Sequence, residues 1–351
     1  MNFMTLKSLE INPSVLIVKP SALGDIVHTF PIVRAIKRSI ENVSIDWAVA
    51  DSYADLARMS PHVSEIFPFK RKEWGRWWRA SSVKEIFGYI KDIRQREYGA
   101  VLDLQGLLRS GLITFAARSD LKIGFENARE GATVFYSAKI PAPDHGAHAI
   151  DRYFSALSGL DIKTPESVGY DLDIPVKESL WADLNTPKEP YAVINPNSRW
   201  ETKRWPAEMF GRLAVELYKN EGLKCVIVGG PDDIERGKAV AQSAGESVID
   251  LTGQGSIVHL AALLKKASAL FSNDSGPLHL AVALGTASVS IFGPTDPSMT
   301  GPYGPGHAVV RKNLDCSPCF KRRCPYNHEC MSQIGVEELI EAWRGLKLEV
   351  S

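Results

Sequence analysis

The stretch Val15-Leu16-Ile17-Val18-Lys19-Pro20-Ser21-Ala22-Leu23-Gly24-Asp25-Ile26 indicates the fold class of the chain. Its four aliphatic residues at 15–18 predict a short buried strand, and the amphipathic pattern that starts at Ile26 predicts a helix. A buried strand that passes through a tight turn into a helix is typical of parallel sheets with crossover helices. We therefore expect an open α/β sheet with a ligand site beyond the carboxyl end of this strand.

The same alternation of β-branched runs and amphipathic stretches continues along the 351 residues, which is a length for about two domains at roughly 150 residues each. Between 169 and 189 the sequence becomes polar and contains prolines, and the alternation then begins again. We predict an N-terminal domain at 1–175, a linker at 176–189 and a C-terminal domain at 190–332. A last helix within 333–351 is expected to pack back on the first domain. The expected strands are 15–19, 44–49, 100–104, 121–123, 191–195, 224–228, 248–251, 269–272 and 287–292, and the expected helices are 26–40, 82–95, 107–117, 148–158, 207–220 and 335–346, with two more starting at Ser256 and Gly276.

The charge and motif content excludes several classes of protein. Lys+Arg and Asp+Glu both number 41, so the net charge of zero does not favour a nucleic-acid partner. Neither G-x-G-x-x-G nor G-x-x-x-x-G-K-[ST] occurs, which argues against a dinucleotide-dependent dehydrogenase and a P-loop protein. The N-terminus lacks a signal-peptide pattern, and the uncharged stretch 276–294 is too polar to span a membrane. We expect a cytoplasmic protein.

Polar side chains gather at two further strand-to-helix junctions, both in the second half. The amides of Ser275 and Gly276 at a helix start would suit a diphosphate, because the helix dipole adds positive potential there. Asp274 is suited to accept from a sugar hydroxyl, and His279 lies one turn into the same helix. The alternative is a purely structural role, in which Asp274 and Ser275 only cap the helix and His279 is a core residue.

The loop after the strand 191–195 offers Ser198, Arg199 and Lys203 to phosphate oxygens, although a solvated charged turn would look the same. In the first half, Asp25 stands near a helix start and faces the expected ligand site. Asp25 is equally suited to be only a helix cap. The convergence of these loops on strand ends is what favours a site.

These residues are similar to those of glycosyltransferase family 9, the lipopolysaccharide heptosyltransferases. That family has the GT-B fold, an α/β architecture in which two Rossmann-like lobes face each other across a cleft. The stretch 15–31 resembles the family's N-terminal motif, 274–281 resembles its donor-site motif, and Lys203-Arg204-Trp205-Pro206 fits its K-x-W-P element. The stretches 101–107 and 128–130 are similar to heptosyltransferase I in particular.

The resemblance implies an inverting, metal-independent transfer of heptose from ADP-L-glycero-D-manno-heptose to a 3-deoxy-octulosonic acid (Kdo) residue of Kdo-lipid A, without a cofactor. Asp25 would be the general base, and Lys203 would stabilise the charge on departing ADP. Heptosyltransferase II or another family 9 enzyme is the alternative, and a noncatalytic metal- or nucleic-acid-binding protein is a distant one. The implied donor-binding residues are Ser198, Arg199, Lys203, Asp274, Ser275, Gly276 and His279, and the implied acceptor-binding residues are Ser21, Gly24, Lys70, Arg71 and Arg129.

The segment 70–96 has nine Lys/Arg against three Asp/Glu and contains Trp74, Trp77 and Trp78. Such a segment suits an anionic membrane face or the phosphates of a lipid A core, which predicts peripheral contact with the cytoplasmic face of the inner membrane. An ordinary solvated helix whose tryptophans pack inward would give the same pattern.

Four of the five cysteines form the pattern C-x2-C-x4-C-x5-C, at Cys316, Cys319, Cys324 and Cys330. Four thiolates at these spacings could hold a structural zinc ion. They could also stay reduced or pair as disulfides under oxidising conditions. Cys225 falls within a predicted strand and is expected to lie in the core.

Overall fold

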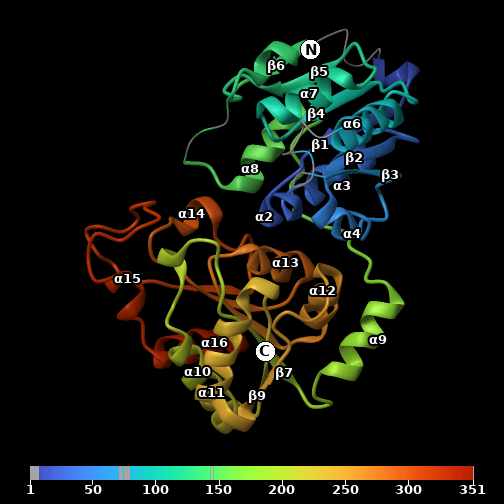
Figure 1. Ribbon diagram of the computed structural model, residues 1–351. Helices are drawn as coiled ribbons and strands as arrows, with labels where there is room; N and C mark the ends of the chain where they lie inside the picture. Colours follow the sequence, from blue (N-terminus) through green and yellow to red (C-terminus); the bar gives the residue numbers. More distant parts are fainter. Residues whose placement is uncertain (1–7, 71–73, 75–79, 143, 145, 351) are drawn as a thin grey trace. The chain divides into compact units, whose positions relative to one another are not determined.

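The computed structural model describes residues 8–70, 74, 80–142, 144 and 146–350. The chain divides into two compact units, Met1–Asp173 and Ile174–Ser351, each with a parallel sheet and helices on its faces (Figure 1). Most of the predicted linker folds as helix α9 (Val176–Asn185), which packs on α12 (Ile257–Lys266) and belongs to the second unit. Within the described residues, no helix has the length and apolarity needed to cross a membrane.

The first unit has a six-stranded parallel sheet in the order β3-β2-β1-β4-β5-β6. Its strands are β1 (Ser14–Val18), β2 (Ser44–Ala50), β3 (Glu65–Phe69), β4 (Ala100–Asp103), β5 (Lys122–Phe125) and β6 (Ala138–Ile140). Its helices are α2 (Leu23–Val27), α3 (Phe30–Ser39), α4 (Ala54–Ala57), α6 (Ala80–Ile93), α7 (Leu108–Ala116) and α8 (Ala149–Phe154), with 3-10 turns η1 (Asp51–Tyr53), η2 (Ala132–Phe135) and η3 (Ser155–Leu160).

The second unit repeats this plan in the order β12-β11-β10-β7-β8-β9. Its strands are β7 (Tyr191–Asn195), β8 (Lys224–Ile227), β9 (Val248–Asp250), β10 (Ala269–Asn273), β11 (Ser288–Ile291) and β12 (His307–Val310). Besides α9 and α12, its helices are α10 (Ala207–Glu221), α11 (Ile234–Ala244), α13 (Gly276–Leu284), α14 (Pro297–Thr300), α15 (Glu329–Ser332) and α16 (Val336–Val350), with 3-10 turns η4 (Glu201–Lys203), η5 (Pro231–Asp233) and η6 (Gly245–Ser247).

Both sheets have the strand order of a Rossmann fold, as the expected GT-B architecture requires. In each sheet the order reverses between the first and fourth strands, which are β1 and β4 in one unit and β7 and β10 in the other. Loops that leave adjacent strands in opposite directions open a crevice at their carboxyl ends. The loops after these four strands are therefore where each unit can hold a ligand.

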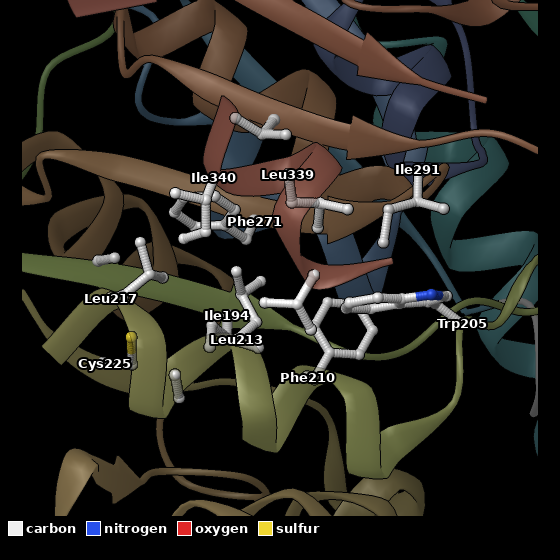
Figure 2. Packing of buried hydrophobic residues seen from close by; sticks show 14 of the residues in the cluster. Ile194, Trp205, Phe210, Leu213, Leu217, Cys225, Phe271, Ile291, Leu339 and Ile340 are labelled. Carbon is white, nitrogen blue, oxygen red and sulfur yellow. The ribbon is translucent and has the colours of Figure 1, made fainter. Parts of the chain in front are cut away.

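The core of the second unit explains the position of the last helix. Leu339 and Ile340 of α16 are buried with Phe271 and Ile291 of the sheet and Phe210 of α10 (Figure 2). The structure thus places this helix in the second unit, and its expected packing on the first domain stays a prediction. Its apolar stripe completes the core of the second unit, because the sheet face between α10 and β12 needs a cover.

The observed elements differ from the sequence prediction in one divided helix and in several elements that were not predicted. The expected helix 26–40 is divided into α2 and α3, with Pro31 in the first turn of α3, because proline has no amide hydrogen to continue a helix. Strands β3, β6 and β12, which were not predicted, all lie at sheet edges. Edge strands are partly exposed and so lack a continuous apolar run. Helix α11 was also not predicted.

Candidate active site

Asp25 is held at the carboxyl end of β1 by both of its carboxylate oxygens. Oδ2 accepts from the amide of Ala22 at 2.9 Å, and Oδ1 accepts from the Tyr153 hydroxyl at 2.7 Å. The side chain nevertheless stays 38% exposed. Asp25 therefore caps the start of α2, which is the alternative role that the sequence offered. Its carboxylate is nevertheless partly exposed to solvent. A capping role and a role as a base are compatible here.

A buried cation lies beside this carboxylate. Lys19 Nζ is 3.7 Å from Asp25 Oδ2, 3.3 Å from the carbonyl oxygen of Leu104 and 4.9 Å from the centre of the Tyr153 ring. The lysine side chain is 3% exposed, and burial lowers its pKa while the neighbouring Asp25 and Asp103 raise it. Lys19 and Tyr153 thus fix the position of Asp25 from the side of the protein, while the carboxylate stays partly exposed.

The loop after β4 completes this end of the first sheet. Asp103, which is fully buried, accepts from the amides of Gln105 and Gly106 at 2.9 and 3.0 Å and so shapes the turn. The Gln105 Oε1 atom accepts from the amide of Ser21 at 3.2 Å, and the carbonyl oxygen of Gly106 accepts from the amide of Arg129 at 2.8 Å. The loop after β4 thereby links the two loops that carry the predicted acceptor residues Ser21 and Arg129.

The other predicted acceptor residues have different surroundings. Gly24 precedes Asp25 in α2 and is partly exposed. Lys70 Nζ lies 3.4 Å from Glu85 Oε2 of α6, which makes it part of an ion pair on the first unit. Arg71, together with Trp77 and Trp78 of the basic segment, lies outside the described residues.

In the second unit, Lys203 and Asp274 form a nearly buried ion pair. Lys203 Nζ lies 2.6 Å from Asp274 Oδ2, and the two side chains are 16% and 5% exposed. The Thr295 hydroxyl donates to the same oxygen at 2.6 Å. The sequence analysis assigned Lys203 to phosphate and Asp274 to a sugar hydroxyl, whereas in the structure each is the partner of the other. A bound anion would compete with Asp274 for the ammonium group.

The remaining residues predicted to bind the donor lie around the start of α13 or on the loop after β7. The Ser198 hydroxyl donates to the carbonyl oxygen of Asp274 at 3.1 Å, and Asn195 Nδ2 donates to the hydroxyl of Ser275 at 2.8 Å. Ser275 is the N-cap of α13 and Gly276 is its first residue, so the positive end of the helix dipole is directed at this position. His279 is buried in the same helix, and Arg199 is exposed on the preceding loop.

The loop that carries Lys203 is anchored by a tryptophan. Trp205 is fully buried, its Nε1 donates to the carbonyl oxygen of Ile334 at 3.0 Å, and its amide donates to Asn273 Oδ1 at 2.9 Å. Arg236 of α11 donates to the carbonyl oxygens of Pro196 and Trp205. These contacts explain why a tryptophan follows the lysine by two residues: the ring fixes the loop, and the lysine reaches Asp274.

The cysteine-rich segment attaches to this same loop. Cys316, Cys319, Cys324 and Cys330 line one cavity of about 260 Å³, and all are free thiols. His328 Nε2 contacts the carbonyl oxygen of Thr202, beside Lys203. In the described part of the chain, no group of three or more His, Cys, Asp or Glu side chains is arranged to hold a metal ion. The zinc site therefore stays a prediction, and the segment acts structurally as a support of the Lys203 loop.

Comparisons with known proteins agree with this geometry. The family described as glycosyltransferase family 9 (heptosyltransferase) matches residues 86–329. Lipopolysaccharide heptosyltransferase 1 of Pseudomonas aeruginosa is 33% identical over 318 residues, which cover 89% of this chain and 87% of that protein. The chain belongs to glycosyltransferase family 9. It is a glycosyltransferase, and its resemblance to heptosyltransferase I, inferred from the sequence motifs, is confirmed.

Solved structures confirm the fold of this family 9 glycosyltransferase. Escherichia coli heptosyltransferase WaaC with ADP is 26% identical and superimposes with a TM-score of 0.79, covering 95% of this chain and 99% of that chain. Escherichia coli ADP-heptose LPS heptosyltransferase II, at 20% identity and the same TM-score, shares the fold. The predicted GT-B class is thus confirmed for the pair of parallel six-stranded sheets.

Several site residues were not found by sequence reasoning. Tyr153, Thr295 and Arg236 contact the key side chains or their loops from 128, 21 and 31–40 positions away in the chain. None stands in a motif that was used to define the site. Thr295 had one signal, since it lies in the loop Gly293-Pro294-Thr295 that comes after strand β11.

Proposed function

We propose that this glycosyltransferase moves heptose from ADP-L-glycero-D-manno-heptose to a Kdo hydroxyl of Kdo-lipid A with inversion at the anomeric carbon. The observation that carries the proposal is the half-exposed Asp25 carboxylate, oriented by Tyr153 and Lys19 at the switch point of the first sheet. The relatives named as lipopolysaccharide heptosyltransferase 1, and the WaaC structure with ADP, support a heptose donor carried by ADP.

On the acceptor side, Asp25 takes the proton of the attacking hydroxyl. The hydroxyl oxygen forms a bond to the anomeric carbon on the face opposite the diphosphate, so the configuration inverts. Ser21 and Gly24 shape the turn beside the carboxylate, and the loop anchored through Gly106 presents Arg129 to the anionic acceptor. Proximity of the two substrates lowers the barrier as much as the proton transfer does.

On the donor side, the bond between the anomeric carbon and the diphosphate oxygen breaks and its electron pair leaves with ADP. Lys203 stabilises this charge once the diphosphate replaces Asp274 as its partner. Ser198, Arg199 and the amides at Ser275 and Gly276 add donors, and His279 and the released Asp274 face the sugar and ribose. We expect transfer without a divalent metal, because Lys203 and the helix start supply the positive charge.

The experiment that tests this function is ADP release from ADP-heptose with Kdo-lipid A as the acceptor, with and without EDTA. Release that requires the acceptor and is insensitive to EDTA is expected. Release only with an already heptosylated core acceptor would assign the chain to heptosyltransferase II instead. No release with either acceptor would overturn the proposal. Because the acceptor is anchored in a membrane, we place the enzyme at the cytoplasmic face of the inner membrane.

A further inference from the structure

Helix α7 exposes three large apolar side chains to solvent. Leu108, Leu112 and Phe115 are spaced by four and three residues, so they share one face, and they are 44%, 50% and 62% exposed. The buried side of the same helix includes Ser110 and Thr114. A helix that only had to fold in water would place Leu and Phe inward. A contiguous exposed apolar surface of this kind indicates an interaction site.

The surface extends to η2, the 3-10 turn packed beside α7. Val134 of η2 is 76% exposed, and the ring of Phe135 lies 5.7 Å from that of Phe115. We call Leu108, Leu112, Phe115 and Val134 the α7 surface. Its members come from two elements of the first unit, and α7, which packs on β4, is labelled in Figure 1.

Cations border the α7 surface. Lys122 Nζ donates to the carbonyl oxygen of Phe115 at 2.9 Å and lies 5.4 Å from the centre of its ring. Arg94 Nη1 donates to the carbonyl oxygen of Ala116 at 3.1 Å, and α7 itself carries Arg109. At the other end, Glu130 Oε2 accepts from the amide of Leu108 at 3.2 Å. Lys122, Arg94 and Arg109 outnumber Glu130 and Asp120, the carboxylate beside Lys122. This excess of cations around apolar side chains matches an anionic lipid surface.

Helix α9 has a second exposed apolar stripe, and the charges around it differ from those around the α7 surface. Helix α9 exposes Val176, Leu180 and Leu184 by 75%, 57% and 83%, which is at least as much as α7 does. Its charges balance, however, because Lys177 stands beside Glu178 and Lys266 pairs with Asp183. The α9 stripe therefore lacks the excess of cations that an anionic bilayer attracts.

The α7 surface also begins at the candidate acceptor site. Gln105, whose side chain accepts from the amide of Ser21 in the Asp25 loop, is only three residues before Leu108. We propose that the α7 surface docks on an anionic phospholipid bilayer and presents the sugar head of a lipid-anchored acceptor to Asp25. The docking rests on the surface itself, and the presentation step rests on the proposed function.

Vesicle sedimentation tests the docking. The full-length protein is mixed with vesicles of equal phosphatidylglycerol and phosphatidylcholine, and the variants Leu112→Asp/Phe115→Asp and Leu180→Asp/Leu184→Asp are compared with the wild type. Both variants add two charges to an exposed helix, and circular dichroism confirms their folding. We expect the α7 variant to bind about tenfold more weakly or worse, and the α9 variant to bind within about twofold of the wild type. Equal binding of both variants, or no binding of the wild type, would overturn the proposal.

Activity separates docking from chemistry. With a soluble Kdo acceptor that lacks lipid, the α7 variant should turn over at the wild-type rate, whereas with Kdo-lipid A in vesicles its rate should fall about tenfold. A similar loss on both acceptors would overturn the role in presentation. If the wild type transfers to neither acceptor, the proposed function fails, while the sedimentation result still decides the docking surface.

Discussion

The Tyr153 hydroxyl donates a hydrogen bond of 2.7 Å to Asp25 Oδ1, and this contact joins α8 to α2, the helix that follows β1. Burial and the adjacent Asp25 carboxylate raise the pKa of Tyr153, so the phenol remains a donor throughout the physiological range. The contact holds one oxygen of Asp25, while the amide of Ala22 holds the other. A general base must have a fixed orientation if it is to take the proton of a positioned hydroxyl group.

Replacing Asp25 by Asn should lower kcat by about a hundredfold or more, because the amide cannot take the proton of the acceptor. The affinity for ADP, measured by isothermal titration, should not change, since the donor site lies in the other unit. Tyr153→Phe should lower kcat less, by about tenfold, because it removes only one hydrogen bond that orients Asp25. Near-normal turnover of the Asp25 variant would exclude this residue as the base.

Replacing Lys203 by Ala should weaken ADP binding by about tenfold or more, since a charge-assisted hydrogen bond to phosphate contributes roughly 1.5–3 kcal/mol. A matched control is Lys312→Ala. Lys312 is paired with Glu338 in the same unit at 2.8 Å and takes no part in the candidate site. Titration with ADP checks both variants, and equal affinities for the two would contradict the placement of Lys203 at the diphosphate.

Stability should fall in mildly acidic solution because of His307 of β12. Burial lowers the pKa of His307 from 6.5 to about 4. Between these values the unfolded chain binds a proton that the folded chain does not, so the free energy of unfolding decreases as the pH falls from 6.5 to 4. The full shift corresponds to about 3 kcal/mol, and partial exposure reduces the expected loss to about 2 kcal/mol.

The variant His307→Gln removes this proton linkage. Urea unfolding followed by circular dichroism at pH 7 and pH 4.5 should then show a smaller pH-dependent loss of stability for the variant than for the wild type. Parallel behaviour of the two proteins would show that His307 is not responsible.

The five thiols should react with iodoacetamide at different rates. Cys316 and Cys324 are exposed, whereas Cys225 and Cys330 are buried. Burial raises the pKa of Cys225 to about 12 and that of Cys330 to about 11, which lowers the fraction of reactive thiolate. Mass spectrometry at pH 8 should find Cys316 and Cys324 alkylated first. Slow labelling of all four clustered thiols that a chelator accelerates would instead show the bound metal ion considered from their spacing.

Local patterns in the sequence were sufficient to predict the architecture of two α/β units. The runs at 15–18 and 191–195, with the helices that follow, predicted two α/β units, because the apolar face of a strand or helix is written in residues that lie close together in the chain. The motifs also located both loops with Asp25 and Lys203, since in parallel sheets a polar residue after a buried strand falls at the ligand-binding edge.

The partners of these residues were decided by the tertiary structure alone. Tyr153 reaches Asp25 across 128 positions, and Lys203 reaches Asp274 across 71. The last helix likewise joins the core of the second unit. No local periodicity encodes such contacts, because they depend on how the strands order themselves in the sheet. The sequence by itself determined the class of fold and the positions of the loops, and only folding determined which side chains orient the carboxylate and the ammonium group.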